Sequence, residues 1–326
     1  MEPFVYSRAR DVQGAIAQLD AHSMYLAGGT ELLNLLKERI VTPARVIDVN
    51  RLPLAAVDID DRLLRIGALA RMSDVAAHPH VRAAFPAISE ALEKSASPQL
   101  RNMASMGGNL MQRTRCPYFR ADTVVPCNKR TPGSGCSALA ADTRAHAIFG
   151  GSEWCVATHP SDVAVALAAF DAVVQVCSST GDRTIPMRDF HRLPDDRPQD
   201  DTTLRFGELI VRIDVPVTPA AQYSHYLKVR ERASYEFALV SAAVGIDVEG
   251  SVIRDVRIAL GGVAPKPWRL NDAEDALRGQ PFTRAGIEAA TRSALRAARP
   301  RHGNAFKVEL AARTVIRAMT HLGASA

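Results

Sequence analysis

The sequence has no long apolar segment and no run of like charges. Near the middle of the chain the longest apolar run, Val163 to Phe170, is eight residues, whereas a membrane-spanning helix needs about 20. We therefore expect no membrane span. The net charge is +5, and nowhere do five or more Lys and Arg follow one another. We expect no nucleic-acid partner, because an anionic cofactor or an acidic protein surface explains this charge equally well.

An export signal is also missing from the N-terminal sequence. Met1 to Phe4 leads into charged sequence at Arg8 and Arg10 without an apolar core behind it. We expect no cleavable signal of the chain's own and assembly in the cytoplasm. If the protein is exported, a partner must carry it.

Cysteine is scarce and odd in number, which argues against a complete disulfide framework. Four of the five cysteines lie in one stretch rich in Pro and Gly: Cys116, Cys127, Cys136 and Cys155. They are separated by ten, eight and eighteen residues, so the sequence has neither the C-x2-C pairs of zinc fingers nor the compact ferredoxin pattern. A long irregular loop needs something to hold it. The spacing alone leaves three alternatives open: an iron–sulfur cluster, a structural zinc ion, or buried thiols without a metal. The fifth cysteine, Cys177, reads as a small buried apolar residue.

Two glycine pairs are the other notable motifs. Ala27-Gly28-Gly29-Thr30 lies between an expected strand (24–26) and an expected helix (31–37), an arrangement in which backbone N–H groups could face a phosphate. Steric demands of a tight strand–helix turn would explain the glycines as well, and the motif is not G-x-G-x-x-G. A second glycine turn follows at Ser105 to Leu110.

Hydrophobic periodicity predicts mixed α+β structure on both sides of a linker at 216–222. Before the linker we expect strands at 4–6, 24–26, 46–49, 63–69, 173–176 and 208–215, and helices at 12–19, 31–37, 85–94 and 162–170. After it we expect strands at 224–229, 239–248 and 252–262, and helices at 271–277, 283–298 and 305–322. The predicted domains are 1–216, with subdomains of about 1–55 and 56–216, and 223–326.

The segment Thr158-His159-Pro160-Ser161-Asp162 follows the last clustered cysteine. Asp162 fits the N-cap of the next helix. His159 is either a satisfied turn histidine or a residue near a cofactor. We find no Ser–His–Asp order and no paired carboxylates, so we assign no catalytic residue.

These motifs together resemble the FAD-binding subunits of the molybdenum hydroxylases, the xanthine dehydrogenase and carbon monoxide dehydrogenase family. More narrowly, the chain is similar to the flavin subunits of three-subunit periplasmic aldehyde oxidoreductases. Matching segments of the first domain are 26–32, 65–69, 99–102, 107–110, 116–119, 127–130, 133–136 and 158–162. Matching segments of the second domain are 228–230, 233–235, 261–264 and 266–269.

The resemblance implies a fold and an FAD site. The fold would be an FAD-binding domain of the vanillyl-alcohol-oxidase (PCMH) type with two subdomains, followed by a C-terminal α+β domain of the CO dehydrogenase flavoprotein type. FAD would lie on two glycine cradles with further contacts from elsewhere in the chain. The implied FAD-binding residues are Leu26, Ala27, Gly28, Gly29, Thr30, Glu31, Leu32, Ile66, Arg101, Ser105, Gly107, Gly108, Asn109, Asp162 and Lys228.

The resemblance also implies iron–sulfur chemistry and partner subunits. Cys116, Cys127, Cys136 and Cys155 would bind one [4Fe–4S] cluster on a loop at about 113–157. The chain would be the electron-transfer subunit of a heterotrimeric, molybdenum-dependent aldehyde oxidoreductase. Electrons would come from [2Fe–2S] clusters of one partner and leave from FAD to an external acceptor, while a molybdenum-cofactor subunit would oxidise the aldehyde. A signal-bearing partner would export the complex to the periplasm.

Three alternatives stay open. The chain could be the flavin subunit of a hydroxybenzoyl-CoA reductase-like enzyme, whose cysteine spacing differs. It could be a zinc-stapled scaffold subunit without catalysis. It could also be a stand-alone FAD oxidase of the same fold.

Overall fold

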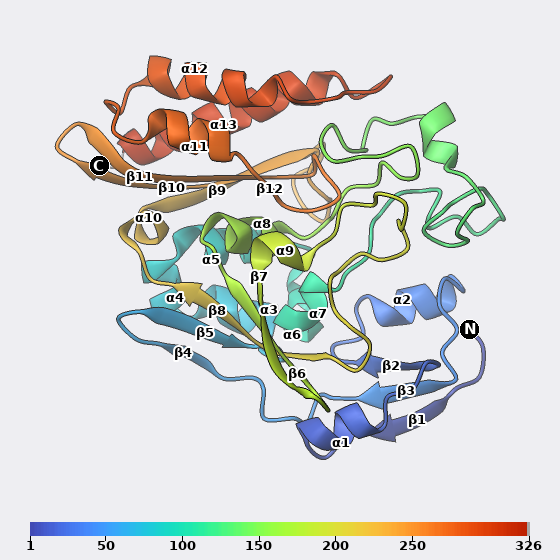
Figure 1. Cartoon of the computed structure of the whole chain (residues 1–326). Coiled ribbons are helices and arrows are strands. Elements are labelled where there is room, and N and C mark those ends of the chain that lie inside the picture. Colours follow the sequence, from blue (N-terminus) through green and yellow to red (C-terminus); the bar gives the residue numbers. More distant parts are fainter. Residues whose placement is uncertain (325–326) are drawn as a thin grey trace.

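The computed structural model describes residues 1–324 of the chain. Residues 325 and 326, the end of the expected domain 223–326, lie outside the described part. Three sheets are stacked along the molecule, with helices between and above them (Figure 1). None of the helices in residues 1–324 has the length and apolar character needed to cross a membrane.

The N-terminal sheet is small and parallel. Its strand order is β1-β3-β2, and β1 and β2 both run parallel to β3. Asp11 begins the first helix by accepting a hydrogen bond from the Gly14 N–H at 2.6 Å, as an N-cap side chain does. The elements are β1 (Val5–Arg8), α1 (Val12–Ala17), β2 (Ser23–Leu26), α2 (Leu32–Lys37) and β3 (Arg45–Asp48).

A five-stranded antiparallel sheet with the order β4-β5-β8-β6-β7 follows. Its strands are β4 (Val57–Ile59), β5 (Leu63–Gly67), β6 (Val173–Ser178), β7 (Gly181–Pro186) and β8 (Leu209–Pro216). The helices of this region are α3 (Met72–Ala77), α4 (Pro79–Ala84), α5 (Pro86–Glu93), α6 (Pro98–Met103), α7 (Met106–Leu110), α8 (Asp162–Ala169) and α9 (Met187–Phe190). All eight residues of α8 are buried, which explains why this stretch is apolar on every side.

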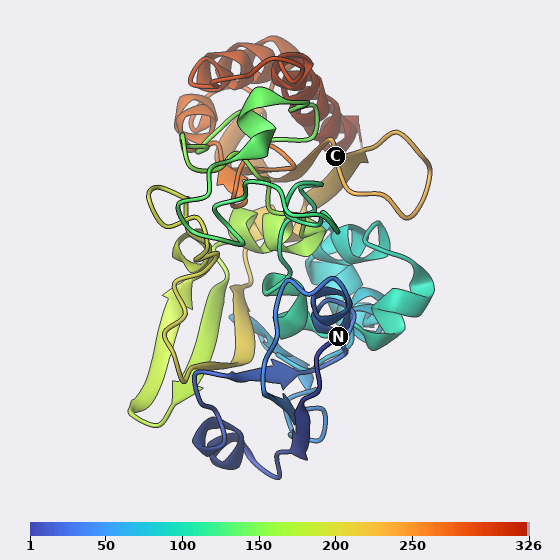
Figure 2. The ribbon, with the colours of Figure 1, turned by 90° about the vertical axis from the view of Figure 1, so that its right-hand side faces the viewer.

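The C-terminal region is a four-stranded antiparallel sheet covered by helices (Figures 1 and 2). Its strands are β9 (Ser224–Val229), β10 (Val240–Glu249), β11 (Val252–Gly261) and β12 (Trp268–Arg269). Its helices are α11 (Asn271–Leu277), α12 (Arg284–Leu295) and α13 (Phe306–Ala324). The two long strands β10 and β11 pair as an antiparallel hairpin, and an apolar core fills the space between sheet and helices.

The connection predicted at 216–222 contains a short helix. Strand β8 extends to Pro216, and Thr218 then begins a short helix, α10 (Pro219–Gln222). Ala220 and Ala221 are fully buried. The connection is therefore packed structure, and its Pro residues mark an element end and a helix start.

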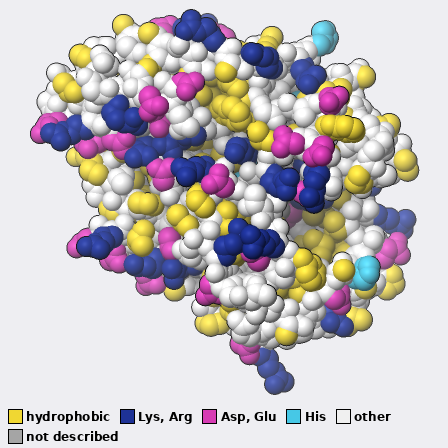
Figure 3. Space-filling view, in the orientation of Figure 1, with side chains coloured by type: hydrophobic (Ala, Val, Ile, Leu, Met, Phe, Trp, Pro, Cys, Tyr) yellow, Lys and Arg dark blue, Asp and Glu magenta, His cyan; other side chains and the backbone are white. Residues whose placement is uncertain are grey.

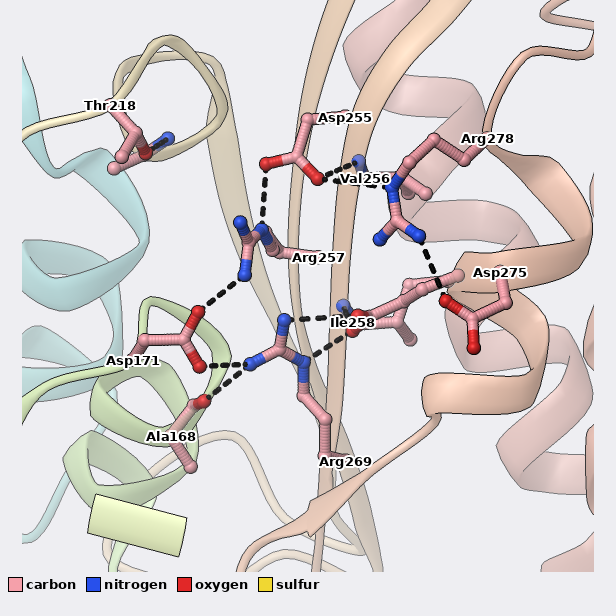
Figure 4. A network of polar contacts seen from close by, with 12 residues as sticks. Ala168, Asp171, Thr218, Asp255, Val256, Arg257, Ile258, Arg269, Asp275 and Arg278 are labelled. Atoms are coloured by element: carbon pink, nitrogen blue, oxygen red, sulfur yellow. Dashed lines mark hydrogen bonds and ion pairs between the residues drawn. The ribbon is translucent and has the colours of Figure 1, made fainter. Parts of the chain in front are cut away.

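Hydrogen bonds and ion pairs join the C-terminal end of helix α8 to the C-terminal region (Figure 4). Arg269 donates to the Ala168 carbonyl and to the Asp171 carboxylate, both at 2.9 Å, and also pairs with buried Glu274. Arg257 pairs with the same Asp171 and with Asp255. Because the Arg269 side chain is only 14% exposed, this network is screened far less than a surface pair.

Residues 111–160 contain one regular element, the 3₁₀ helix η1 (Ser137–Ala140). We call residues 111–160 the cysteine segment. In Figure 2 it runs beside α8 and the C-terminal sheet as a long irregular loop. The face seen in Figure 3 carries positive and negative side chains mixed together, in line with the mild net charge.

Candidate functional site

The two glycine pairs lie on segments that pack backbone against backbone. A Cβ at Gly28 would lie 1.8 Å from the Met103 carbonyl oxygen, and one at Gly107 would lie 3.1 Å from Ala68 Cβ. Gly29 has a φ of 75°, which a residue with a side chain rarely adopts. Glycine is thus required here by close approach and by backbone conformation together.

The second glycine pair forms a helix, which corrects our expectation of a turn. Residues 106–110 are α7, and the Ser105 hydroxyl accepts a hydrogen bond from the Gly108 N–H at 3.2 Å. Serine is a preferred N-cap residue, so Ser105 in the sequence already indicates that a helix can begin here.

A cavity of about 820 Å³ opens between these segments; we call it the large cavity. Its volume falls in the range of roughly 300–1,000 Å³ typical of small-molecule and cofactor sites. Nine of the predicted FAD-binding residues line it: Ala27, Gly28, Gly29, Thr30, Glu31, Leu32, Ser105, Gly107 and Gly108.

The opposite wall comes from the loop that follows α9 and from the first two residues of β8, within residues 191–210. Arg113 joins this wall to the cysteine segment by donating to Asp201 at 2.6 Å. Burial opposes the charge of Asp201, yet Lys129 and Arg113 outweigh burial and lower the pKa of its carboxyl. The sequence assigned no site role to this wall, because nothing local shows that it folds back over the glycines.

Glu31 lines the large cavity and contacts three arginines of the cysteine segment. It pairs with Arg115 at 2.7 Å and with Arg120 at 2.5 Å, and it accepts the Arg113 N–H at 2.9 Å. Burial opposes ionisation, but the guanidinium groups outweigh burial and lower the pKa of the Glu31 carboxyl. Glu31 therefore ties the first glycine segment to the cysteine segment as an anion.

Apart from Glu31 Oε2, which pairs with the Arg115 guanidinium, two buried acceptor atoms of the lining residues lack hydrogen-bond partners among residues 1–324. They are Gln199 Oε1 and His191 Nδ1. Buried polar atoms normally have partners, so these acceptors call for a ligand with N–H or O–H groups. FAD, with a hydroxylated ribityl chain and an anionic pyrophosphate, fits the acceptors, the glycine walls and the volume of this cavity.

Four other predicted FAD contacts lie outside this lining. Leu26 is in β2, and Ile66 is fully buried in β5. Arg101 donates to the Ser95 carbonyl at 2.7 Å. Asn109 Oδ1 accepts a hydrogen bond from the Ser161 hydroxyl at 2.5 Å, and so connects α7 with the start of α8.

Asp162 and Lys228 form a buried ion pair at 2.8 Å, and neither lines the large cavity. Asp162 also accepts hydrogen bonds from Tyr226 Oη at 2.6 Å and Ser95 Oγ at 3.0 Å. Ser161, and not Asp162, supplies the N-cap of α8, by accepting the Ala164 N–H. Asp162 instead fastens the first residue of α8 to β9 of the C-terminal region.

A second cavity of about 70 Å³ lies between the cysteine segment and the C-terminal region; we call it the small cavity. Its lining includes Arg115, Cys116, His146, His159, Asp162 and Phe237. The Arg115 guanidinium lies 5.0 Å from the centre of the Phe237 ring.

The four clustered cysteines come near one another but do not form a single-ion site. Cys127 and Cys136 are antiparallel bridge partners. Burial raises the pKa of the Cys116 thiol to about 12, with smaller contributions from Cys155 and Cys127. Burial also raises the pKa of Cys155, and Cys136 and Cys127 add to this effect. No group of three or more metal-ligand side chains in residues 1–324 could hold one ion.

A zinc ion and a cluster would require different spacings of the four sulfurs. Four thiolates on one zinc ion would lie about 3.8 Å apart, given Zn–S bonds of about 2.3 Å. In a [4Fe–4S] cluster each thiolate binds a different iron, so the sulfurs stay farther apart. His146 Nε2 lies 3.2 Å from Cys116 Sγ, a neighbour that the cysteine spacing could not reveal.

Two family models cover nearly the whole chain. Residues 2–218 match the FAD binding domain in molybdopterin dehydrogenase, and residues 225–322 match the CO dehydrogenase flavoprotein C-terminal domain. The fold that we expected from the sequence is thereby confirmed.

Similar proteins agree with these models. The chain is 47% identical, over 100% of both chains, to the aldehyde oxidoreductase FAD-binding subunit PaoB of Escherichia coli (strain K12). It is 29% identical to the glyceraldehyde dehydrogenase medium chain of Sulfolobus acidocaldarius, covering 85% of this chain and 82% of that one. Among solved structures it is similar to carbon monoxide dehydrogenase from Hydrogenophaga pseudoflava, with a TM-score of 0.77 at 27% identity, covering 99% of this chain and 98% of the other.

Proposed function

This chain belongs to the FAD-binding medium subunits of the molybdenum hydroxylase family, and we propose that it is the electron-transfer subunit of a molybdenum-dependent aldehyde oxidoreductase. The observation that carries the proposal is the large cavity, whose walls are the two glycine segments and whose lining holds two unpartnered acceptors. Bound FAD would supply reversible two-electron chemistry there.

The protein's own groups would hold FAD in a defined position. The segments of Gly28, Gly29 and Gly107 would offer backbone N–H groups to the pyrophosphate, and the missing side chains let these segments pack closely against neighbouring protein atoms. Gln199 Oε1 would accept a hydrogen bond from a ligand hydroxyl or N–H group. The wall at residues 191–210 would cover the opposite side and limit access of water.

We further propose that Cys116, Cys127, Cys136 and Cys155 bind one [4Fe–4S] cluster. The observation that supports this is that the thiols lie close enough to act on one another: Cys155 and Cys127 contribute to the raised pKa of Cys116, and Cys136 and Cys127 contribute to that of Cys155. Lys129 lowers the pKa of Cys155 against the larger effect of burial, so one cation favours the thiolate form that binds iron.

Electrons would reach this chain from [2Fe–2S] clusters of one partner subunit and leave it for an external acceptor. A third subunit would hold the molybdenum cofactor and the aldehyde. The 47% identity to an aldehyde oxidoreductase FAD-binding subunit over the full chain supports this assignment. We assign no catalytic acid or base to the chain. Export to the periplasm with a signal-bearing partner is part of the same proposal.

Cofactor analysis of the purified full chain tests the proposal. We expect one FAD, about four irons per chain, and broad iron–sulfur absorbance over the flavin bands. One zinc with neither iron nor flavin would instead support the scaffold alternative. Substrate oxidation by the chain without any partner would support the stand-alone oxidase. Reduction of an aromatic acyl-CoA by the assembled complex would support the hydroxybenzoyl-CoA reductase-like alternative.

A single substitution separates the two cofactors. Cys127→Ser should remove the iron signal and leave much of the FAD bound, because Cys127 does not line the large cavity. Cys177→Ala is the matched control, since Cys177 lies in β6, apart from the other four cysteines. Loss of FAD together with iron in Cys127→Ser would mean that the cysteine segment holds the whole domain together.

A further inference from the structure

Two histidines meet between the two cavities. The ring centroids of His159 and His191 lie 4.0 Å apart, with the planes tilted by 44°. His191 lines the large cavity and His159 lines the small one. The pair is thus in contact with both cavities, whereas the proposed function uses only the His191 Nδ1 acceptor and gives His159 no task.

Hydrogen bonding fixes the tautomer of His191. Its Nε2 lies 2.9 Å from the Leu110 carbonyl oxygen, which can only accept, so Nε2 carries the hydrogen in the neutral ring. Nδ1 then presents a lone pair, and within residues 1–324 it has no partner. His159 Nε2 is likewise buried without a partner in that part of the chain. Each ring therefore has a buried nitrogen whose hydrogen-bonding capacity is unused.

The surroundings keep both rings neutral. Burial lowers the pKa of His191 to about 4; the Leu110 carbonyl and Asp201 act in the opposite direction, and Lys266 reinforces burial. Burial also lowers the pKa of His159, and His191, Lys129 and Arg115 lower it further. Three cations and one anion face the pair, so negative charge arriving in the large cavity would act on uncharged imidazoles in a low-dielectric environment.

We propose that the His159–His191 pair is a redox-linked proton-binding site, which takes up one proton when the large cavity's flavin is reduced and releases it on reoxidation. The inference rests on the proposed function, because it needs FAD in that cavity. Two electrons come from reduced iron–sulfur clusters of a partner chain. The proton comes from solvent and forms one N–H bond on a ring nitrogen, in addition to the protons bound by the flavin itself.

Proton uptake by the FAD-loaded full chain tests this directly. The chain is reduced photochemically at about pH 5 and about pH 8 with an indicator dye present, and uptake is compared with that of His191→Gln. The Gln side chain can keep a donor for the Leu110 carbonyl but cannot titrate. At about pH 5 we expect the wild type to take up about one proton more per flavin than the variant, and at about pH 8 the same number. The exposed His80 provides the matched control, and His80→Gln should behave as the wild type.

Two further measurements keep the proposal testable if His191→Gln folds poorly. His159→Gln should show the same deficit of uptake at about pH 5. Histidine C–H resonances of the wild type, followed by NMR, should show a pKa that rises on reduction. Equal uptake in the wild type and both variants, or histidine titrations unchanged by reduction, would overturn the proposal. A chain that binds no FAD would overturn the proposed function as well, whereas FAD binding with equal uptake would overturn the histidine pair alone.

Discussion

The large cavity and the cysteine segment are neighbours held by different forces. Around the cavity, main chains pack directly against each other, as Gly28 does against Met103. The cysteine segment is held by side chains that reach across to main-chain oxygens. Lys129 donates to the Pro198 carbonyl at 2.6 Å, and Lys307 donates to the carbonyls of Gly262 at 2.8 Å and His146 at 3.1 Å.

This difference predicts how strongly substitutions in each region affect the protein. Backbone packing leaves no room for an added atom, so small substitutions should be severe at the glycines. Side-chain tethers are several and partly redundant, since Asp201 keeps Arg113 when Lys129 is lost. We therefore expect the effects of substitution to decrease from the cavity wall to the cysteine segment.

The largest effect should come from Gly28→Ala. The new Cβ would overlap the Met103 carbonyl oxygen at 1.8 Å, so main chain must move and the two glycine segments must separate. We expect the free energy of unfolding to fall by about 4 kcal/mol and FAD content to fall at least about tenfold. Denaturant unfolding and flavin absorbance measure the two effects. Gly14→Ala, where only the Asp11 side chain is near, should change neither appreciably; equal behaviour of the two variants would contradict the packing argument.

Asp162→Asn should come next. It leaves Lys228, whose side chain is 1% exposed, without its carboxylate, and breaking a buried pair costs about 3 kcal/mol or more. Tyr226→Phe removes only one hydrogen bond to the same carboxylate and should cost about 1 kcal/mol. Chemical unfolding of both variants checks this order. Normal stability of Asp162→Asn with loss of FAD would instead support the sequence-based prediction that Asp162 contacts FAD.

The sequence predicts the regular elements of the C-terminal region and the first glycine segment because their patterns are local. Strands β10 and β11 and helix α12 carry their periodicity locally, and Gly28-Gly29 lies between a strand and a helix that the pattern also reveals. The wall at residues 191–210 and the contact of His191 with His159 depend on long-range packing, which periodicity does not encode. Asp162 was expected from the sequence as an N-cap and as an FAD contact, whereas its partner Tyr226 and its position beside the small cavity required the fold.

Lys129→Met should have an intermediate effect. It removes the tether to Pro198 and one of the two cations on Asp201, while Arg113 stays at 2.6 Å. We expect a loss of about 2 kcal/mol in the free energy of unfolding and faster proteolysis within the cysteine segment than in the wild type. Arg130→Met is the neighbouring control, because Arg130 donates only within the segment, to the Ala121 carbonyl. If proteolysis of Lys129→Met cleaved only the glycine segments, Lys129 would support the cavity wall and not the cysteine segment, which would contradict this prediction.

Per pH unit, the smallest effect should be the pH dependence of Lys307. Burial lowers the pKa of its ammonium from 10.5 to about 7 in the folded chain. Between these values the unfolded chain binds more protons than the folded one, so stability rises with pH, by at most about 1.4 kcal/mol per pH unit. Lys307→Met lacks this contribution. The stability of the wild type relative to Lys307→Met should therefore rise as the pH increases above about 7, and parallel curves would contradict the assignment.

The central claim is that FAD lies between the two glycine segments and the wall at residues 191–210. Hydrogen–deuterium exchange of the full chain with and without FAD tests it most directly. The structure predicts that FAD slows exchange at residues 27–32, 105–111 and 191–205 and leaves the far helices α12 and α13 unchanged. FAD binding that leaves all three of these segments unprotected would contradict the account.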